Sequence, residues 1–279
     1  VGWRVSRRLT KPLLAVTAVT EQMSGGDLSA RAAVSGNDEV GQLATSFNQM
    51  AAQVEGPVQT LSRFVADAAH EINTPLTALK TNLELIDGEE NGREQFRLHQ
   101  AQQQIERLEA LTAGLLDLSV VEGQKQPPQA LERVDVGLLL RQSSELFASR
   151  AEQKGVAFVL QLPERSLWVR GQPLSLQQAV AALLDNALKF TIDGEIVVSA
   201  SASGEQVHLT VSDTGLGVEA DEAALIFGRF FRGRKTADFP GSGLGLVIAQ
   251  AIVQQHQGDI QYKPLASGSS FIISLPQIQ

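Results

Sequence analysis

The stretch Asp67–Leu76, with the sequence DAAHEINTPL, places a histidine, a glutamate and a threonine within about one helical turn. His70 and Glu71 could begin a zinc-protease helix, or His70 could be a nucleophile with a carboxylate beside it. A zinc protease needs His-Glu-x-x-His, so that two imidazoles one turn apart share the metal. Thr74 stands where the second histidine would be, and Pro75 follows it directly, which argues against a rigid zinc-ligand helix.

The histidine is expected to face away from an apolar stripe on its own helix, roughly 160° from the centre of that stripe. The stripe consists of Leu61, Val65, Ala68, Ile72, Leu76, Leu79, Leu83 and Ile86. Glu71 could hydrogen-bond one ring nitrogen of His70 and leave the other nucleophilic, while the Thr74 hydroxyl could position a water. An ordinary surface histidine is the alternative. The remaining histidines lack such neighbours and are interpreted as structural or surface residues: His99, His208 and His256.

Two glycine clusters, at 211–220 and 241–250, could bring backbone amides close to a phosphate or a base. The first cluster, VSDTGLGVEA, formally matches the dinucleotide pattern at Gly215, Gly217 and Ala220, but no parallel βαβ unit precedes it. The second cluster, GSGLGLVIAQ, lacks the Gly-Lys-Ser/Thr of a P-loop. It does place unhindered amides where a helix begins, which suits phosphate oxygens.

A third polar element lies in LLDNALKFT, residues 183–191. Asn186 is polar on an otherwise apolar helix face, either as a satisfied core amide or as a ligand for Mg²⁺ held mainly by oxygen atoms. Lys189 lies one turn further on, where it could meet a phosphate.

Composition excludes several classes of protein. The net charge of −8 argues against a nucleic-acid partner, because phosphate neutralisation needs clustered Lys and Arg. The absence of cysteine removes disulfides, thiolate metal sites and Cys nucleophiles. No stretch is long and apolar enough to be a membrane span. The opening VGWRVSRRL nevertheless resembles the cytoplasmic flank of a membrane helix, so we expect an anchor upstream of residue 1; a basic helix start on a soluble protein is the alternative.

The chain of 279 residues is expected to contain more than one domain. Helical patterns at 9–23 and 40–54 flank a polar connector, and Gly56–Pro57 is expected to end that unit. A helical hairpin follows, with a turn at 87–92 and a second helix at 93–121, and then a linker at 122–132. Beyond the linker, strands are expected at 156–162, 167–171, 194–203, 206–213 and 268–276, with helices at 137–149, 174–190 and 244–257.

Together these motifs resemble the sensor histidine kinases of two-component signalling. FVADAAHEINTPLTAL resembles the phosphoacceptor box, LLDNALKFT the N box, VSDTGLGV and GSGLGLVIA the two glycine boxes, and IFGRFFRG the F box. GDLSARAAVSGNDEVGQLATSFNQM is similar to a HAMP signal-relay module. The motifs occur in family order and cover nearly the whole chain.

The resemblance implies roles for individual residues. His70 would be phosphorylated, Glu71 would be its base or tautomer-fixing partner, and Thr74 would orient a water that dephosphorylates the regulator. Asp213 would accept from the adenine amine, and Asn186 would hold Mg²⁺. The remaining ATP-binding residues would be Lys189, Phe190, Gly215, Gly217, Arg232, Gly241, Ser242, Gly243, Leu244 and Gly245, with the lid running from about 227 to 245.

The chain departs from the family pattern in four places. Ala182 and Gln172 replace residues that are often polar and acidic, and Asn73 replaces a frequent Arg or Lys beside the nucleophile. Gly56–Pro57 interrupts what is often a continuous signalling helix, where a kink is expected.

The expected protein is multidomain. An α-helical HAMP coiled coil at 1–57 precedes a dimerisation and phosphotransfer hairpin at 58–125 that forms a dimer bundle. An α/β sandwich of the Bergerat type at 126–279 binds ATP. The implied activity is ATP-dependent autophosphorylation of His70, transfer to an Asp of a response regulator receiver domain, and phosphatase activity on that regulator. The fragment would be cytoplasmic, in a homodimer anchored in the bacterial inner membrane. An ATP hydrolase of the same fold group and a non-catalytic scaffold are the alternatives.

Overall fold

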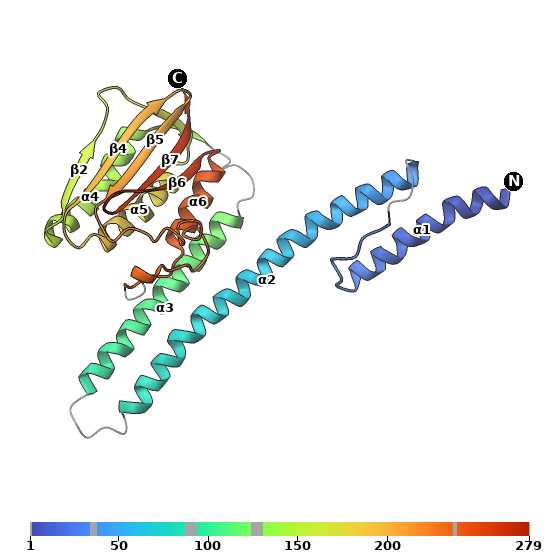
Figure 1. Ribbon diagram of the computed structural model, residues 1–279, viewed down its shortest axis with the longest axis horizontal. Helices are drawn as coiled ribbons and strands as arrows, with labels where there is room; N and C mark the ends of the chain where they lie inside the picture. The colour runs from blue at the N-terminus through green and yellow to red at the C-terminus, as the bar shows by residue number, and fades with distance from the viewer. Residues whose placement is uncertain (1, 34–37, 87–93, 124–130, 237–238, 279) are drawn as a thin grey trace. The chain divides into compact units, whose positions relative to one another are not determined.

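The structure is a computed structural model that describes the chain except for residues 1, 34–37, 87–93, 124–130, 237–238 and 279 (Figure 1). The expected turn at 87–92 and most of the expected linker at 122–132 lie outside the described residues. The chain divides into two compact units, residues 1–70 and 71–279, and each is described separately. Among the described helices, none combines the length and apolarity that a membrane crossing requires.

The first unit is built from α1 (Gly2–Ser24), an extended connector and the first part of α2 (Glu39–Ile86). Its core is a cluster of small and apolar side chains, Ala32, Ala44, Phe47 and Ala51, against which Val16, Val19 and Met23 pack. The Asn48 side chain fixes the connector, because its amide both donates to the Ala32 carbonyl and accepts from the Ala32 N–H, at 2.9 Å each.

Gly56–Pro57, where the first helical unit was expected to end, lies inside a continuous helix. α2 continues from Glu39 to Ile86 through both residues. Proline in a helix interior removes one backbone hydrogen bond and disfavours the preceding turn. Two side-chain bonds lie beside the pair: the Thr60 hydroxyl donates to the Gly56 carbonyl at 2.9 Å, and the Gln59 amide donates to Glu55 at 2.8 Å.

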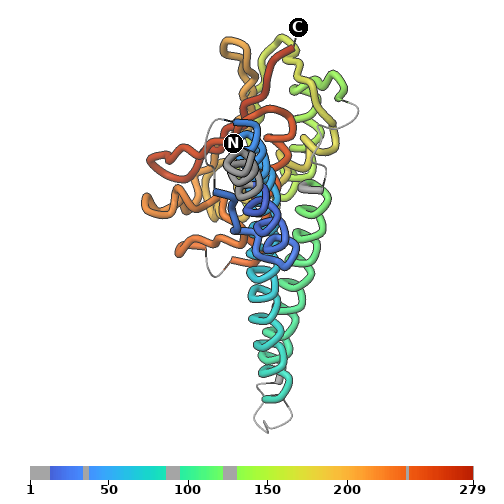
Figure 2. The backbone as a smooth tube through the Cα atoms, turned by 90° about the vertical axis from the view of Figure 1, so that its right-hand side faces the viewer, coloured from blue at the N-terminus to red at the C-terminus, as the bar shows by residue number. Residues whose placement is uncertain are grey.

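In the second unit, the end of α2 and α3 (Glu94–Gly123) run side by side in both views (Figures 1 and 2). Polar groups connect the two helices. Arg107 forms an ion pair with Glu71 at 3.4 Å, and Arg97 donates to Asn82 at 3.5 Å.

The rest of the second unit is a mixed sheet with three helices on one face, which confirms the expected fold class (Figure 1). The strand order is β1-β3-β7-β5-β4-β2, β6 pairs with β7, and β2–β4 is parallel while the other pairs are antiparallel. The strands are β1 (Glu132–Asp135), β2 (Ala157–Gln161), β3 (Trp168–Gly171), β4 (Glu195–Ser203), β5 (Gln206–Asp213), β6 (Asp259–Pro264) and β7 (Ser269–Ile278). The helices are α4 (Val136–Lys154), α5 (Pro173–Phe190) and α6 (Gly245–Gln255).

The core of this domain lies between the helices and the alternating inward side chains of β4, β5 and β7. Leu140, Leu184 and Ile252 contribute from the three helices and have no exposed surface. β1 and β6 were not expected from the sequence.

His256 is structural, as interpreted from the sequence. Its ring is 3% exposed and uses both nitrogens, with Nδ1 at 2.7 Å from the Ile252 carbonyl and Nε2 at 2.9 Å from the Gln172 N–H. Because Nε2 accepts this bond, the ring is neutral, and burial lowers the pKa of His256. The bond connects the end of α6 to the start of α5, the helix that carries Asn186 and Lys189.

The N-cap of α4 gives a test of the fold. Asp135 accepts from the N–H groups of Gly137 and Leu138, at 2.8 and 3.2 Å. Asp135→Ala is expected to lower the free energy of unfolding by about 1 kcal/mol, and Asp135→Asn to retain most of it, because asparagine also caps helices. Urea unfolding followed by tryptophan fluorescence measures both variants; equal losses would contradict a capping role.

Candidate functional site

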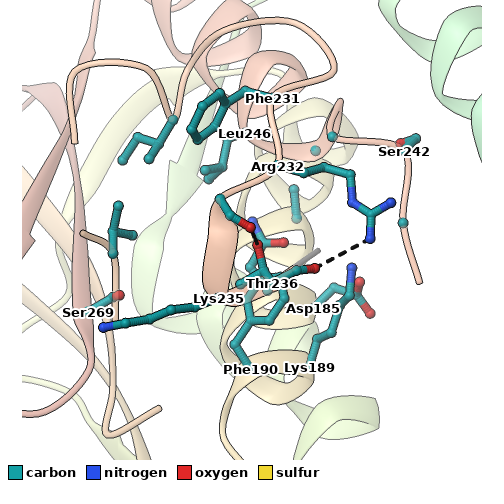
Figure 3. A pocket seen from close by; sticks show the side chains of 18 of the residues that line it. Asp185, Lys189, Phe190, Phe231, Arg232, Lys235, Thr236, Ser242, Leu246 and Ser269 are labelled. Atoms are coloured by element: carbon teal, nitrogen blue, oxygen red, sulfur yellow. Dashed lines mark hydrogen bonds between the residues drawn. The ribbon is translucent and has the colours of Figure 1, made fainter. Parts of the chain in front are cut away.

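A cavity of about 290 Å³ lies between α5, the end of β5 and the segment that leads into α6 (Figure 3). It brings together almost all the residues expected to bind nucleotide. These are Asn186, Lys189, Phe190, Asp213, Gly217, Arg232, Gly241, Ser242, Gly243 and Gly245. Gly215 and Leu244 do not line it.

One end of the cavity is acidic. Asp213 is the last residue of β5 and only 5% of its surface is exposed. Burial raises the pKa of Asp213 to about 6, although backbone hydrogen bonds from Gly215 and Ser269 favour the charged form. The Gly215 N–H lies 2.9 Å from its carboxylate oxygen. The carboxylate is therefore ionised at neutral pH and is a strong acceptor for an amine donor.

Another part of the wall is cationic, where Lys189 and Arg232 line the cavity (Figure 3). Burial lowers the pKa of Lys189; Asp185 opposes this effect and the positive charge of Arg232 adds to it. Arg232 is directed by the chain around it, since its guanidinium donates to the carbonyls of Thr236, at 3.3 Å, and Phe239. Two basic side chains that line one cavity favour an anionic ligand there.

Glycine is required where the backbone passes close to these side chains. A Cβ on Gly241 would lie 2.4 Å from the Lys189 ammonium nitrogen. Gly243 has φ of +70°, and a Cβ there would lie 2.7 Å from the Phe230 carbonyl carbon. Side chains at these positions would displace the cation or separate the two ends of the segment. Gly215 packs against the Phe190 carbonyl, so it shapes the cavity from behind its wall.

Phe190 provides an aromatic part of the cavity wall, beside Lys189. Its ring meets Phe239 edge to face, with centroids 5.5 Å apart, and the Lys189 ammonium lies 4.9 Å from the Phe190 centroid. An aromatic face in a partly apolar cavity suits a planar base.

The cavity fits a metal held mainly by a ligand's own oxygens. Asn186 lines the wall with Asp185, and both offer oxygen donors on α5. Within the described residues, no group of three or more His, Cys, Asp or Glu side chains could hold a metal ion. Mg²⁺ needs few protein ligands when substrate phosphates supply the others.

The DAAHEINTPL segment lies within α2. His70 and Thr74 are exposed, as expected, and Pro75 is buried. Glu71 is half-buried and forms an ion pair with Arg107 of α3. Consecutive side chains on a helix point in different directions, so Glu71 can contact the neighbouring helix while His70 is exposed. The sequence did not indicate Arg107 as the partner of Glu71, because the two residues lie far apart along the chain.

Several residues that line the cavity were also missed: Asp185, Val218, Glu222, Ile226, Lys235, Thr236, Ser269 and Phe271. Asp185 and Lys235 lie within or beside recognised motifs and could have been proposed. Ser269 and Phe271 enter through the register of β5 with β7, which pairs Asp213 with Ser269.

Three family models match the chain. The HAMP domain model matches residues 4–56, and the His Kinase A (phospho-acceptor) domain model matches residues 60–124. The model for histidine kinase-, DNA gyrase B- and HSP90-like ATPases matches residues 171–279, which makes this an ATP-binding domain.

The signal transduction histidine-protein kinase BaeS of Escherichia coli (strain K12) is 32% identical over 279 residues, covering 98% of this chain and 59% of BaeS. The histidine-protein kinase/phosphatase MprB of Mycobacterium leprae (strain TN) is 32% identical over 279 residues, covering 96% of this chain and 52% of MprB. The solved structure of the Acinetobacter baumannii histidine kinase AdeS has a TM-score of 0.57 and 26% identity, covering 75% of this chain and 98% of that one.

These matches define a signalling protein with an ATP-binding domain. The chain belongs to the sensor histidine kinases, and it spans 52% to 59% of the length of the two curated relatives described.

The buried Asp213 predicts a pH dependence for nucleotide binding. Its pKa of about 6 means that the carboxylate is charged above that pH and protonated below it. ATP affinity is therefore expected to fall as the pH drops below about 6, because the protonated acid loses acceptor capacity toward the adenine amine. Calorimetric titration with a non-hydrolysable ATP analogue between about pH 5 and pH 8 measures this. Asp213→Asn should bind weakly, with a flatter profile; an unchanged slope in that variant would exclude Asp213 as its origin.

Proposed function

We propose that this chain is a protein-histidine kinase that phosphorylates His70 from ATP bound in the cavity of its sheet domain. One observation carries the proposal: a buried acceptor, Asp213, lines the same cavity as the cations Lys189 and Arg232, in a domain matched by the ATPase model. The exposed His70 lies in the segment matched by the phosphoacceptor model.

The chemistry asks mainly for positioning and neutralisation of charge. A neutral imidazole nitrogen of His70 attacks the γ-phosphorus, a P–N bond forms, the bond to the bridging oxygen breaks, and ADP leaves. The imidazole proton passes to a base, for which Glu71 is the adjacent candidate. Lys189 and Arg232 offset the charge of the phosphates, and Phe190 packs near the adenine.

We assign Asn186 as the protein ligand of Mg²⁺, which when bound neutralises phosphate charge and fixes the geometry of the triphosphate. Gly217, Gly241, Gly243 and Gly245 keep the backbone close to the nucleotide. Ser242 adds a hydroxyl to the cavity wall, whereas Gly215 and Leu244 act indirectly through packing.

The second half of the reaction transfers the phosphoryl group from His70 to an aspartate of a response regulator receiver domain. We also propose phosphatase activity on that regulator, in which the Thr74 hydroxyl orients the attacking water. The kinase/phosphatase name of the MprB relatives and the exposed position of Thr74 support this proposal.

We further propose a homodimer. Leu61, Val65, Leu76 and Leu83, members of the apolar stripe on α2, are about half exposed in the single chain, which favours burial against a second copy. The domain limits at 1–57, 58–125 and 126–279 also remain proposals. The HAMP match supports a cytoplasmic fragment of a kinase anchored in the bacterial inner membrane.

Transfer of label from γ-labelled ATP tests the kinase function. The wild-type chain is expected to acquire acid-labile, alkali-stable label, and His70→Gln to acquire none. Free phosphate without labelled protein would indicate an ATP hydrolase, and absence of nucleotide binding would indicate a scaffold.

A second variant separates the two activities. Thr74→Ala is expected to autophosphorylate normally but to dephosphorylate the phosphorylated regulator at least about tenfold more slowly, because the water loses its partner. Thr77→Ala is the matched control: its exposed hydroxyl donates to the Asn73 carbonyl at 2.8 Å within the same helix. Equal loss in both variants would point to a disturbed helix.

A further inference from the structure

A buried carboxylate, that of Glu222, binds the segment that carries Arg232 to the residues that follow the first glycine box. Glu222 lines the nucleotide cavity, and its side chain is 11% exposed. One of its carboxylate oxygens accepts both the backbone N–H and the side-chain Nε–H of Arg234, at 3.1 Å each. Because the backbone bond fixes the chain itself, Glu222 determines where this turn lies.

The turn is built to receive that carboxylate. A Cβ on Gly233 would lie 2.9 Å from the other Glu222 oxygen, so glycine permits the close approach. The Thr236 N–H and hydroxyl both bond to the Gly233 carbonyl, at 2.9 and 3.0 Å. Lys235 extends the connection, with its ammonium at 3.1 Å from Glu219 and 3.2 Å from the Leu216 carbonyl.

The turn at 233–236 also orients Arg232. The Arg232 guanidinium donates to the Thr236 carbonyl, which belongs to the turn that Glu222 holds (Figure 3). A displacement of the turn would therefore move one of the two carbonyl acceptors of Arg232 and change the position of its charge. Glu222 touches Arg234 and acts on Arg232 only through the backbone.

We propose that Glu222 is a positioning residue for ATP, which through Arg234 fixes the turn at 233–236 and thereby directs Arg232 at the terminal phosphate. The inference deepens the proposed kinase function and rests on it, because it takes ATP as the ligand. It assigns Glu222 no contact with the reacting atoms.

The sign of the effect distinguishes this role from a simple charge effect. Glu222 is an anion in the wall of a cavity that receives a triphosphate, so removal of its charge alone would strengthen ATP binding. Positioning predicts the opposite: Glu222→Gln weakens ATP binding although it removes a negative charge. ADP lacks the terminal phosphate, so its affinity should change much less.

The experiment measures the dissociation constants of ATP and ADP by calorimetry with Mg²⁺, on the full chain carrying His70→Gln so that ATP is not consumed. In Glu222→Gln, the preference for ATP over ADP is expected to fall about three- to tenfold. In Arg234→Gln the fall is expected to be smaller but measurable, because the backbone bond to Glu222 remains and only the side-chain bond is lost. When Arg232→Gln is already present, Glu222→Gln should cause no further fall, because the residue to be positioned is absent.

Asp221→Asn is the matched control. Asp221 also binds Arg234, at 2.6 and 2.7 Å, but its side chain is 70% exposed and does not line the cavity. The nucleotide preference should change by less than about twofold, because exposed ion pairs contribute little.

Three results would overturn the proposal: stronger ATP binding by Glu222→Gln, equal weakening of ATP and ADP, or an undiminished effect in the Arg232→Gln background. If Glu222→Gln fails to fold, Arg234→Gln decides alone, since that side chain is 66% exposed. If the parent His70→Gln chain binds neither nucleotide, the kinase function itself fails and this inference with it. ATP binding by the parent with an unchanged preference in the variants refutes the positioning role alone.

Discussion

The buried carboxylate of Asp213 is the constraint on which the nucleotide cavity depends. An ionised acid that is 5% exposed must receive hydrogen bonds, and here backbone N–H groups supply them at the end of β5. The backbone must therefore come very close: a Cβ on Gly215 would lie 2.9 Å from the Asp213 carboxylate and 2.5 Å from the Phe190 carbonyl oxygen. The same glycine thus lies against both the buried acid and the end of α5.

The two cationic side chains of the cavity are positioned in different ways. Lys189 is anchored by α5, a helix whose inner face is fully packed, so its position is set by the core. Arg232 lies on an irregular segment and obtains its direction from carbonyl groups and from the turn beneath it. The two cations thus reach the same cavity from a packed helix and from an irregular segment.

The sequence predicted the parts of the protein whose signals are local. Valine- and isoleucine-rich runs predicted β2, β3, β4, β5 and β7, and the glycine boxes with Asn186, Lys189 and Asp213 predicted most of the cavity wall. It missed β1 and β6, which are short or polar and are defined by pairing with distant strands. The pairs Glu71–Arg107 and Glu222–Arg234 were missed for a similar reason: each joins residues separated along the chain, and the charges alone do not indicate which partners meet.

The continuity of α2 through Gly56–Pro57 shows how packing overrides propensity. Proline within a helix costs about 3 kcal/mol relative to alanine, and glycine about 1 kcal/mol, so the pair locally favours a break. The helix continues because contacts on its N-terminal side resist that break: Arg31 of the connector pairs with Glu55, and Phe47 and Ala51 are buried in the core of the first unit. The unfavourable helix propensity of Gly56 and Pro57 therefore remains in the folded protein and weakens the helical turn around them. Proline and glycine make this turn easier to bend than the helix on either side. Gly56–Pro57 therefore marks a boundary between helical units in the sequence without interrupting the helix in the structure.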